Sequence, residues 1–293
     1  MQIAFHIGAN CTDEDRLLKS ILKNADVLLQ QSIAVPGPGK YRKLIREAIE
    51  SLDGGAPASG ARDVLLDAIV EDDNIARLVL SNDNFITVPK RIFDHSVFYH
   101  QAEKKLHGLH ALFPDDEISL FLGLRHPASF LQEAMRRADV GSLAHYLGVL
   151  TPHEVRWSDV VQRIRRAAPQ TPLYVWCNED TPLIWEELMR LQTGVSADTP
   201  MAGQFDVLSR IITRQGMQEV ARRMHAIARG DVEARQNLIA DMLEAHSLPD
   251  LTEDSIDLPE LDGPTIEAMT DAYEADLEVI AQIEGVELIQ PFD

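Results

Sequence analysis

The sequence contains only two cysteines, Cys11 and Cys177, among its 293 residues. Two cysteines so far apart form neither the paired spacing of a zinc site nor a disulfide framework, so we predict no metal and expect the cytoplasm as the location. No run of 18 uninterrupted apolar residues occurs, and the N-terminus lacks a basic segment followed by an apolar one. We therefore expect neither a membrane span nor a secretory signal.

Positive charge is missing from the last fifth of the chain. Residues 236–293 carry 16 acidic side chains and no lysine or arginine, whereas residues 1–235 carry 31 acidic and 27 basic ones. The net charge of −20 favours repulsion from nucleic acids and from anionic membrane surfaces. Aromatic residues make up only 6% of the chain, and no RNA-binding motif is visible. We expect no nucleic-acid partner and no membrane partner, although the first part retains enough basic residues for a local anion pocket.

Short apolar runs alternate with helical patterns over the first two thirds of the chain. The runs typical of strands lie at 2–8, 76–82, 118–125 and 172–177. The helical patterns lie at 13–23, 41–52, 61–70, 100–112, 127–137 and 157–167 and from Thr181 onward. Strands separated by helices indicate βα units, so we predict a three-layer α/β body with a mainly parallel sheet over residues 1–195.

The pattern changes to long helices after about residue 196. Apolar residues recur at helical spacing over 205–212 and again over 266–283. The predicted second part, residues 196–293, is therefore an acidic helical extension that packs on the body and turns its carboxylates to water. Residues 247–263 are acidic and contain proline, which indicates an irregular linker. The closing GVELIQPF, residues 285–292, is a candidate for an added strand.

Polar side chains follow each predicted strand. Ligands of parallel α/β sheets bind beyond the carboxyl ends of the strands, so these segments form the candidate site. They are residues 10–13, 81–84, 125–126 and 177–180.

Three of these segments carry a family resemblance. They are HIGANCTDE (6–14), LSNDNF (80–85) and LFLGLRHPASFL (120–131). In their order and in the elements that carry them, they resemble the sulfotransferases of the P-loop-like fold, over about residues 1–190. The bacterial branch commonly begins with HIGxxKTGT, continues with a Ser-Glu or Ser-Asn-Glu segment, and places Arg-x-Pro at a strand end. The whole chain looks closest to uncharacterised sulfotransferase-like proteins of alphaproteobacteria.

The resemblance implies a three-layer, P-loop NTPase-like fold with a helical C-terminal extension. It also implies sulfuryl transfer from 3′-phosphoadenosine 5′-phosphosulfate, with Asp83 as the candidate catalytic base and Arg125 on the 3′-phosphate of the donor. Main-chain amides of the first loop would cradle the sulfate. The donor-binding residues that it implies are Gly8, Ala9, Asn10, Cys11, Thr12 and Arg125.

The first loop departs from the family pattern. Cys11 occupies the position of the family's lysine, and Asp13 and Glu14 replace the following Gly and Thr. A thiol cannot supply the lysine's charge-assisted hydrogen bond, which contributes about 1.5–3 kcal/mol. Thr12 is predicted to cap the following helix in an approximate capping box with Asp15, which would occupy the free amides.

A further departure lies on the helix after Arg125, where Glu133 stands in place of a serine that assists at the 3′-phosphate in the family. Together these departures make binding of the donor doubtful, and we predict weak or no nucleotide binding. For residues 12–15 the sequence leaves three interpretations open: a plain acidic helix cap, a ligand site with altered chemistry, and active sulfuryl transfer.

Other candidate residues have a structural alternative. Arg125 either binds an anion or pairs with a core carboxylate such as Asp83 or Glu179. The Cys11 thiol is either reactive at a helix N-terminus or, as we favour, buried and idle. His126 is favoured as a polar residue beside a proline turn over a base. His107 and His110 have a spacing that metal ligands use, but an exposed helix face is favoured.

The acceptor is expected to be a small molecule or a glycan. Lys40 and Arg42, with the neighbouring Lys43 and Arg46, either attract an anionic acceptor or form a solvated helix face that pairs with acids, which is the favoured interpretation. Asn178 and Glu179 at the end of a strand either contact substrate or start a helix.

The sequence thus favours a sulfotransferase-family protein with a degenerate donor site. The alternatives are a non-catalytic binding or regulatory protein on the same scaffold, and a different transferase or hydrolase that uses the same strand-end cleft.

Overall fold

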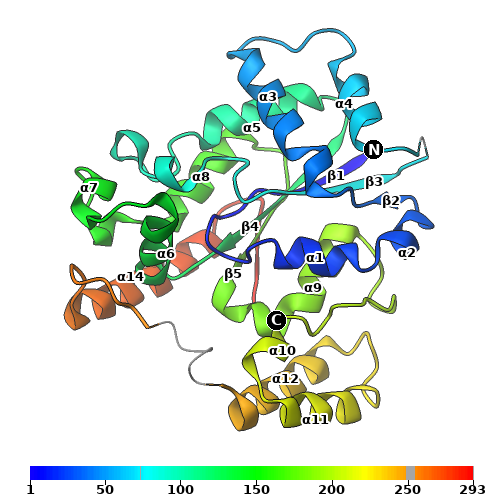
Figure 1. Ribbon diagram of the computed structural model, residues 1–293, viewed down its shortest axis with the longest axis vertical. Coiled ribbons are helices and arrows are strands. Elements are labelled where there is room, and N and C mark those ends of the chain that lie inside the picture. The colour runs from blue at the N-terminus through cyan, green and yellow to red at the C-terminus, as the bar shows by residue number, and fades with distance from the viewer. Residues whose placement is uncertain (73, 249–254, 293) are drawn as a thin grey trace.

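Six parallel strands form the central sheet of the protein in a computed structural model that describes residues 1–72, 74–248 and 255–292 (Figure 1). The strand order is β2-β3-β1-β4-β5-β6. The register places Phe5 of β1 between Leu80 of β3 and Leu120 of β4. The strands are β1 (Gln2–His6), β2 (Ile33–Ala34), β3 (Arg77–Ser81), β4 (Glu117–Leu124), β5 (Leu173–Cys177) and β6 (Val286–Ile289). The predicted α/β class with a parallel sheet is confirmed.

Alternate residues of the central strands enter two different hydrophobic cores. Ile3 and Phe5 of β1 belong to one core, whereas Ala4 between them belongs to the other. Burial on both faces explains why β1 and β4 read as nearly continuous apolar runs rather than as alternating ones. The four predicted strands are confirmed within one or two residues. The closing strand is confirmed as well, but it ends three residues before the predicted residue 292. The two-residue β2 was not predicted.

Helices cover both faces of the sheet and make three layers (Figure 1). One face carries α1 (Arg16–Leu22), α2 (Ala25–Leu29) and α9 (Thr181–Thr193). The other carries α3 (Arg42–Leu52), α4 (Ala61–Ile69), α5 (Ala102–Leu112), α6 (Pro127–Ala138), α7 (Leu143–Leu147), α8 (Trp157–Ala167) and α14 (Gly263–Ala281). Short 3₁₀ turns are η1 (Pro38–Lys40), η2 (Pro89–Arg91), η3 (Asp94–Ser96), η4 (Pro152–Glu154) and η5 (Asn178–Asp180).

The chain after residue 195 has two parts. Helices α10 (Leu208–Ile211), α11 (Arg214–Met224) and α12 (Val232–His246) share a small core of their own at the bottom of Figure 1. The later part returns to the body, where α14 packs on α6 and α8 and β6 pairs with β5. The division at residue 195 stays a prediction. Of the predicted linker, residues 249–254 lie outside the described residues.

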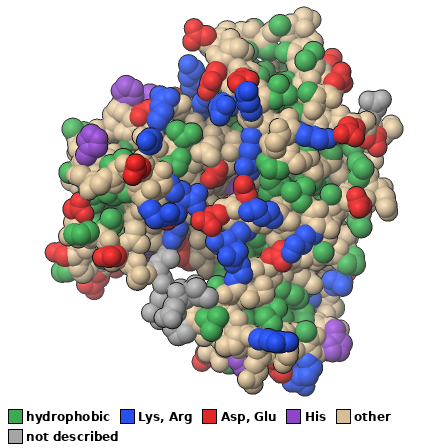
Figure 2. All heavy atoms as spheres, in the orientation of Figure 1, with side chains coloured by type: hydrophobic (Ala, Val, Ile, Leu, Met, Phe, Trp, Pro, Cys, Tyr) green, Lys and Arg blue, Asp and Glu red, His purple; other side chains and the backbone are tan. Residues whose placement is uncertain are grey.

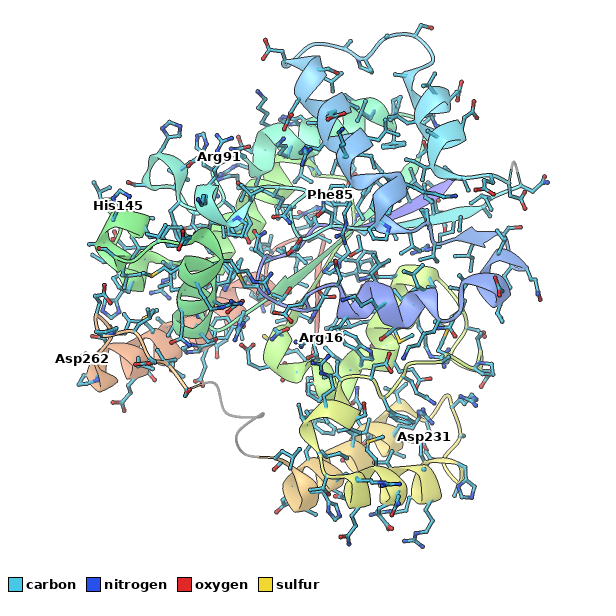
Figure 3. All side chains as sticks on the ribbon, in the orientation of Figure 1. Arg16, Phe85, Arg91, His145, Asp231 and Asp262 are labelled. Carbon is cyan, nitrogen blue, oxygen red and sulfur yellow. The ribbon has the colours of Figure 1, made fainter. Side chains whose placement is uncertain are left out.

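Aspartate side chains start the two later helices. Asp231 accepts a hydrogen bond from the amide of Ala234 at 3.1 Å, and Asp262 accepts one from the amide of Thr265 at 2.9 Å. Both aspartates are labelled in Figure 3, at the beginnings of α12 and α14. Each satisfies an amide that the first helical turn leaves unpaired. Across the described parts of the chain, no helix combines the length and the apolar character that crossing a membrane requires.

The connections of two adjacent strands diverge at the carboxyl edge of the sheet. β1 leads to α1 on one face, whereas its neighbour β4 leads to α6 on the opposite face. Ligands of open α/β sheets commonly bind where the connections of adjacent parallel strands diverge in this way. The first loop and the end of β4 therefore lie where this fold class usually places its ligand.

A buried carboxylate joins the C-terminal part to the body. Asp276 of α14 accepts hydrogen bonds from the amide and the hydroxyl of Ser158, at 2.9 and 2.5 Å. Asp276 is 5% exposed and Ser158 is 7% exposed. Because Ser158 lies in the first turn of α8, the aspartate acts as a cap supplied by another helix.

We expect Asp276→Ala to lower the free energy of unfolding by about 2 kcal/mol, because it leaves a buried amide and a buried hydroxyl without an acceptor. Urea denaturation followed by circular dichroism measures this. The control is Glu274→Ala on the exposed face of α14, which should change stability by less than about 0.5 kcal/mol. Equal effects of the two substitutions would contradict the role assigned to Asp276.

Candidate functional site

The segments that follow β1, β3, β4 and β5 contact one another at the carboxyl edge. Arg125 Nη1 donates to the carbonyl oxygen of Cys11 at 2.8 Å, which joins the end of β4 to the first loop. Asn10 Nδ2 donates to Asn84 Oδ1 at 3.1 Å. The structure therefore brings together residues that the sequence places more than 70 positions apart.

The first loop is buried and held by the protein itself. Residues 8–13 are all buried. The main-chain amide of Asn10 donates to Tyr99 Oη at 3.0 Å, and Tyr99 Oη donates to Asn10 Oδ1 at 2.8 Å. The amide of Ala9 donates to the carbonyl of Gly123 at 2.9 Å. At least two loop amides are thus already used within the protein.

Glycine is required at position 8. Its φ of +123° is one that residues with a side chain rarely adopt, and an added Cβ would lie 3.2 Å from the main-chain oxygen of Asp83. The loops after β1 and β3 therefore approach each other closely at this point.

The predicted capping box is wrong. Thr12 Oγ1 donates to the carbonyl of Ala9 at 2.8 Å and caps no helix. The helix begins at Arg16 rather than at Asp13, because the backbone takes positive φ values at Glu14 and Asp15. Asp13 contacts the start of the helix instead: its carboxylate accepts a hydrogen bond from the main-chain amide of Leu17 at 2.9 Å.

Asp15 is paired with Arg42. The guanidinium contacts both carboxylate oxygens, at 3.0 and 2.5 Å, and its Nε donates to the main-chain oxygen of Ser81 at 2.9 Å. Burial acts to raise the pKa of Asp15, but the hydrogen bonds and the charge of Arg42 outweigh it, so the pKa lies below its usual value. The pair is a bidentate, charge-assisted contact between the first loop, α3 and β3.

A second group of charges surrounds Glu14. Its carboxylate contacts Arg137 at 2.7 Å and Arg16 at 2.8 Å, and Arg137 also contacts Glu133 at 2.7 Å. The hydrogen bonds of Arg136 and Arg137 outweigh burial and lower the pKa of Glu133 to about 2. Figure 2 shows basic and acidic side chains interleaved across the middle of this face, and Figure 3 labels Arg16 there. Glu14 and Asp15 of the loop are therefore paired with arginines of the same chain.

Asp83, the candidate base, lies beside these charges. Asn84 Nδ2 donates to its Oδ1 at 2.7 Å, and Arg137 Nη1 is 3.8 Å from its Oδ2. Burial raises the pKa of Asp83, and the carboxylates of Asp15 and Asp13 raise it further. A carboxylate with a raised pKa is a better proton acceptor near neutral pH.

Arg125 is held in place from several sides. Besides Cys11, it contacts Ser129 Oγ at 3.2 Å through Nε, and its main-chain oxygen accepts Trp157 Nε1 at 2.8 Å. Next to it, the amide of His126 donates to Glu179 at 2.8 Å, and His126 Nε2 lies 3.0 Å from Thr270 Oγ1. The end of β4 therefore reaches the start of α9 and the side of α14.

The predicted acceptor-binding residues do not form one group. Lys40 pairs with Glu71 at 2.6 Å, and both side chains are largely exposed. Lys43 pairs with Glu47 at 3.7 Å, so pairing with neighbouring acids is confirmed for these two lysines. Arg42 instead turns onto the first loop.

Asn178 and Glu179 lie in η5 at the end of β5. The Asn178 carbonyl accepts Thr181 Oγ1 at 2.6 Å, a contact typical of a helix start. Glu179 contacts the main chain of His126, as described above. These two residues therefore lie between the end of β5 and the start of α9, and Glu179 reaches the end of β4.

Sequence reasoning missed Tyr99, Arg137 and Tyr41. Tyr41 Oη accepts the amide of Ser81 at 2.9 Å and donates to its carbonyl at 2.7 Å. The buried His6 was missed as well: its Nδ1 lies 2.9 Å from Ser81 Oγ, and its Nε2 has no partner among the described residues. No local pattern marks Tyr99, Tyr41 and His6, because their partners lie 40 or more positions away. Arg137 has one partner on its own helix, Glu133, but its partner in the first loop, Glu14, lies 123 positions away.

Within residues 1–72, 74–248 and 255–292, no group of three or more His, Cys, Asp or Glu side chains is arranged to hold a metal ion. Of the two histidines on α5, His110 lies 3.2 Å from Thr171 Oγ1 through Nε2.

Comparisons of the chain with protein families, with curated proteins and with solved structures find no match. The function is therefore inferred from the chain's own residues.

Both thiols are expected to be unreactive in the folded protein. Cys11 and Cys177 are buried, and burial raises the pKa of each to about 12. Near pH 8 only about one thiol in ten thousand would be ionised. We expect no reaction with a disulfide reagent such as Ellman's within minutes, and two equivalents after unfolding in urea. Fast modification of one thiol in the native protein would contradict the idle role assigned to Cys11.

Proposed function

We propose that this chain is a sulfotransferase-like protein with a P-loop-like fold and a degenerate donor site. We further propose that it is a non-catalytic binding or regulatory protein and does not transfer sulfuryl groups. The observation that carries the proposal is the pairing of Asp15 with Arg42 at 3.0 and 2.5 Å. A cation that could face a donor phosphate is committed to a carboxylate on the loop itself. The resemblance in residues 6–14, 80–85 and 120–131 supports the family, and the divergence of the connections after β1 and β4 supports the location.

The charge of the loop argues against the donor. An anion at the main chain of residues 8–12 would approach the carboxylates that follow, and one carboxylate about 5 Å away costs about 3 kcal/mol at an effective dielectric near 20. The lysine that would compensate is replaced by Cys11, whose thiol stays neutral because burial raises its pKa to about 12. Binding would also have to displace arginines from their present partners.

Residual sulfuryl transfer is the second candidate function, and the raised pKa of Asp83 favours it. In this case Asp83 would take the proton of an acceptor hydroxyl as its oxygen attacks the sulfuryl group, and 3′-phosphoadenosine 5′-phosphate would leave with Arg125 on its 3′-phosphate. Main-chain amides of the loop other than those of Ala9 and Asn10 would hold the sulfate. The acceptor is a small molecule or a glycan. An assay of sulfate transfer to a phenol separates the two candidates, since activity that Asp83→Asn abolishes would support catalysis over binding.

The wild-type protein is expected to bind 3′-phosphoadenosine 5′-phosphate with a Kd weaker than about 1 mM near physiological salt, because the loop supplies no uncompensated cation. Isothermal titration calorimetry measures this directly. A low-micromolar affinity that Arg125→Ala abolishes would show that the donor site is intact.

Asp15→Asn is expected to strengthen binding of the same nucleotide by about tenfold or more, because it removes one carboxylate and releases Arg42. Glu71→Gln is the matched control: it changes the net charge equally and releases the exposed Lys40 away from the loop. Circular dichroism checks that both variants are folded. Equal gains in the two variants would indicate a general charge effect, and no gain in either would mean that the pairing with Arg42 does not exclude the nucleotide.

A further inference from the structure

A cavity of about 520 Å³ lies on the face of the sheet that carries α9, near the amino ends of the strands. Its floor includes Gln2, Ser119 and Tyr174 from three neighbouring strands, and α9 and α12 form walls. These two helices lie next to each other in the lower half of Figure 1. The volume falls in the range of sites for small molecules, and none of the residues assigned above to the carboxyl edge lines it.

Arginine outnumbers acid in this cavity. The lining contains four arginines and two glutamates. Glu186 contacts two of the arginines, Arg190 and Arg235, each at 2.5 Å. Arg77 and Arg229 form no ion pair with any carboxylate in the described part of the chain. Among the described residues, the lining of the cavity therefore carries more positive than negative charge.

Arg77 is only partly exposed and bonds to neutral acceptors alone. Its guanidinium donates to the main-chain oxygens of Gln192 and Leu191, at 2.8 and 3.0 Å, and to Gln2 Oε1 at 2.8 Å. Three of its five N–H groups are used in this way. Burial lowers the pKa of Arg77, as expected for a cation held away from water without a carboxylate partner.

The remaining walls are largely apolar. Leu183 and Trp185 of α9, Phe205 of the following segment, and Val232 and Ile239 of α12 line the cavity. Val232 is 42% exposed, so part of this apolar wall is open to solvent. A ligand that satisfies both features has an apolar body and a single negative charge.

We propose that this cavity is a binding site for a small amphipathic carboxylate, such as a medium-chain fatty acid. The carboxylate pairs with the free N–H groups of Arg77, the exposed Arg229 adds attraction, and the apolar body packs between α9 and α12. The cavity is separate from the carboxyl edge, so the proposed carboxylate site does not depend on whether the protein binds a nucleotide.

The test is isothermal titration calorimetry of the full chain with octanoate and with octanol, which has the same apolar chain without the charge. We expect octanoate to bind with a Kd below about 1 mM and octanol to bind at least about tenfold more weakly. Equal binding of the two probes, or no binding of octanoate, would overturn the proposal.

Variants locate the site. Arg77→Gln should weaken octanoate about tenfold or more, and Val232→Glu, which adds a negative charge at an exposed position of the wall, should weaken it similarly. The control is Arg166→Gln, which removes an exposed arginine paired with Glu103 outside the cavity and should leave the affinity unchanged. If Arg77→Gln fails to fold, Val232→Glu alone tests whether octanoate binds in this cavity. Unchanged affinity for octanoate in Val232→Glu would mean that octanoate binds elsewhere.

Discussion

The contact of Arg42 with Asp15 and Ser81 ties the first loop to the neighbouring elements of the body. One guanidinium joins the loop after β1, the first turn of α3 and the last residue of β3. Tyr41, the preceding residue, bonds both main-chain groups of Ser81. In a loop that binds phosphate, the bound anion would hold the main-chain amides of the loop in position. Here the carboxylate of Asp15 and the guanidinium of Arg42, both from the same chain, take the place of that anion.

The two edges of the sheet differ in how charge is balanced. At the carboxyl edge each of the three loop acids has a partner: Asp13 has an amide, and Glu14 and Asp15 have arginines. A new anion there meets carboxylates and must compete for cations. In the cavity near the amino edge, Arg77 and Arg229 lack such partners among the described residues. Anion binding is therefore easier to explain in that cavity than at the edge where the fold usually places it.

The sequence predicted the sheet well because a strand buried on both faces appears in the sequence as a short apolar run. It missed β2, since two residues make no pattern. It placed the start of α1 three residues too early, because Thr12 resembles a helix cap, whereas positive φ at Glu14 and Asp15 delays the helix. The residues that close the site could not be predicted, because Arg137 lies 123 positions from Glu14 and Tyr99 lies 89 from Asn10.

In this interpretation the pair of Asp15 and Arg42 holds the first loop in place of a ligand. A double-mutant cycle with Asp15→Ala, Arg42→Ala and the double variant, measured by urea denaturation, tests this role of the pair. We expect a coupling energy of about 1–2 kcal/mol, since the contact is bidentate and partly buried. Additive effects, with a coupling energy below about 0.3 kcal/mol, would contradict it, because the loop would then keep its position without this pair.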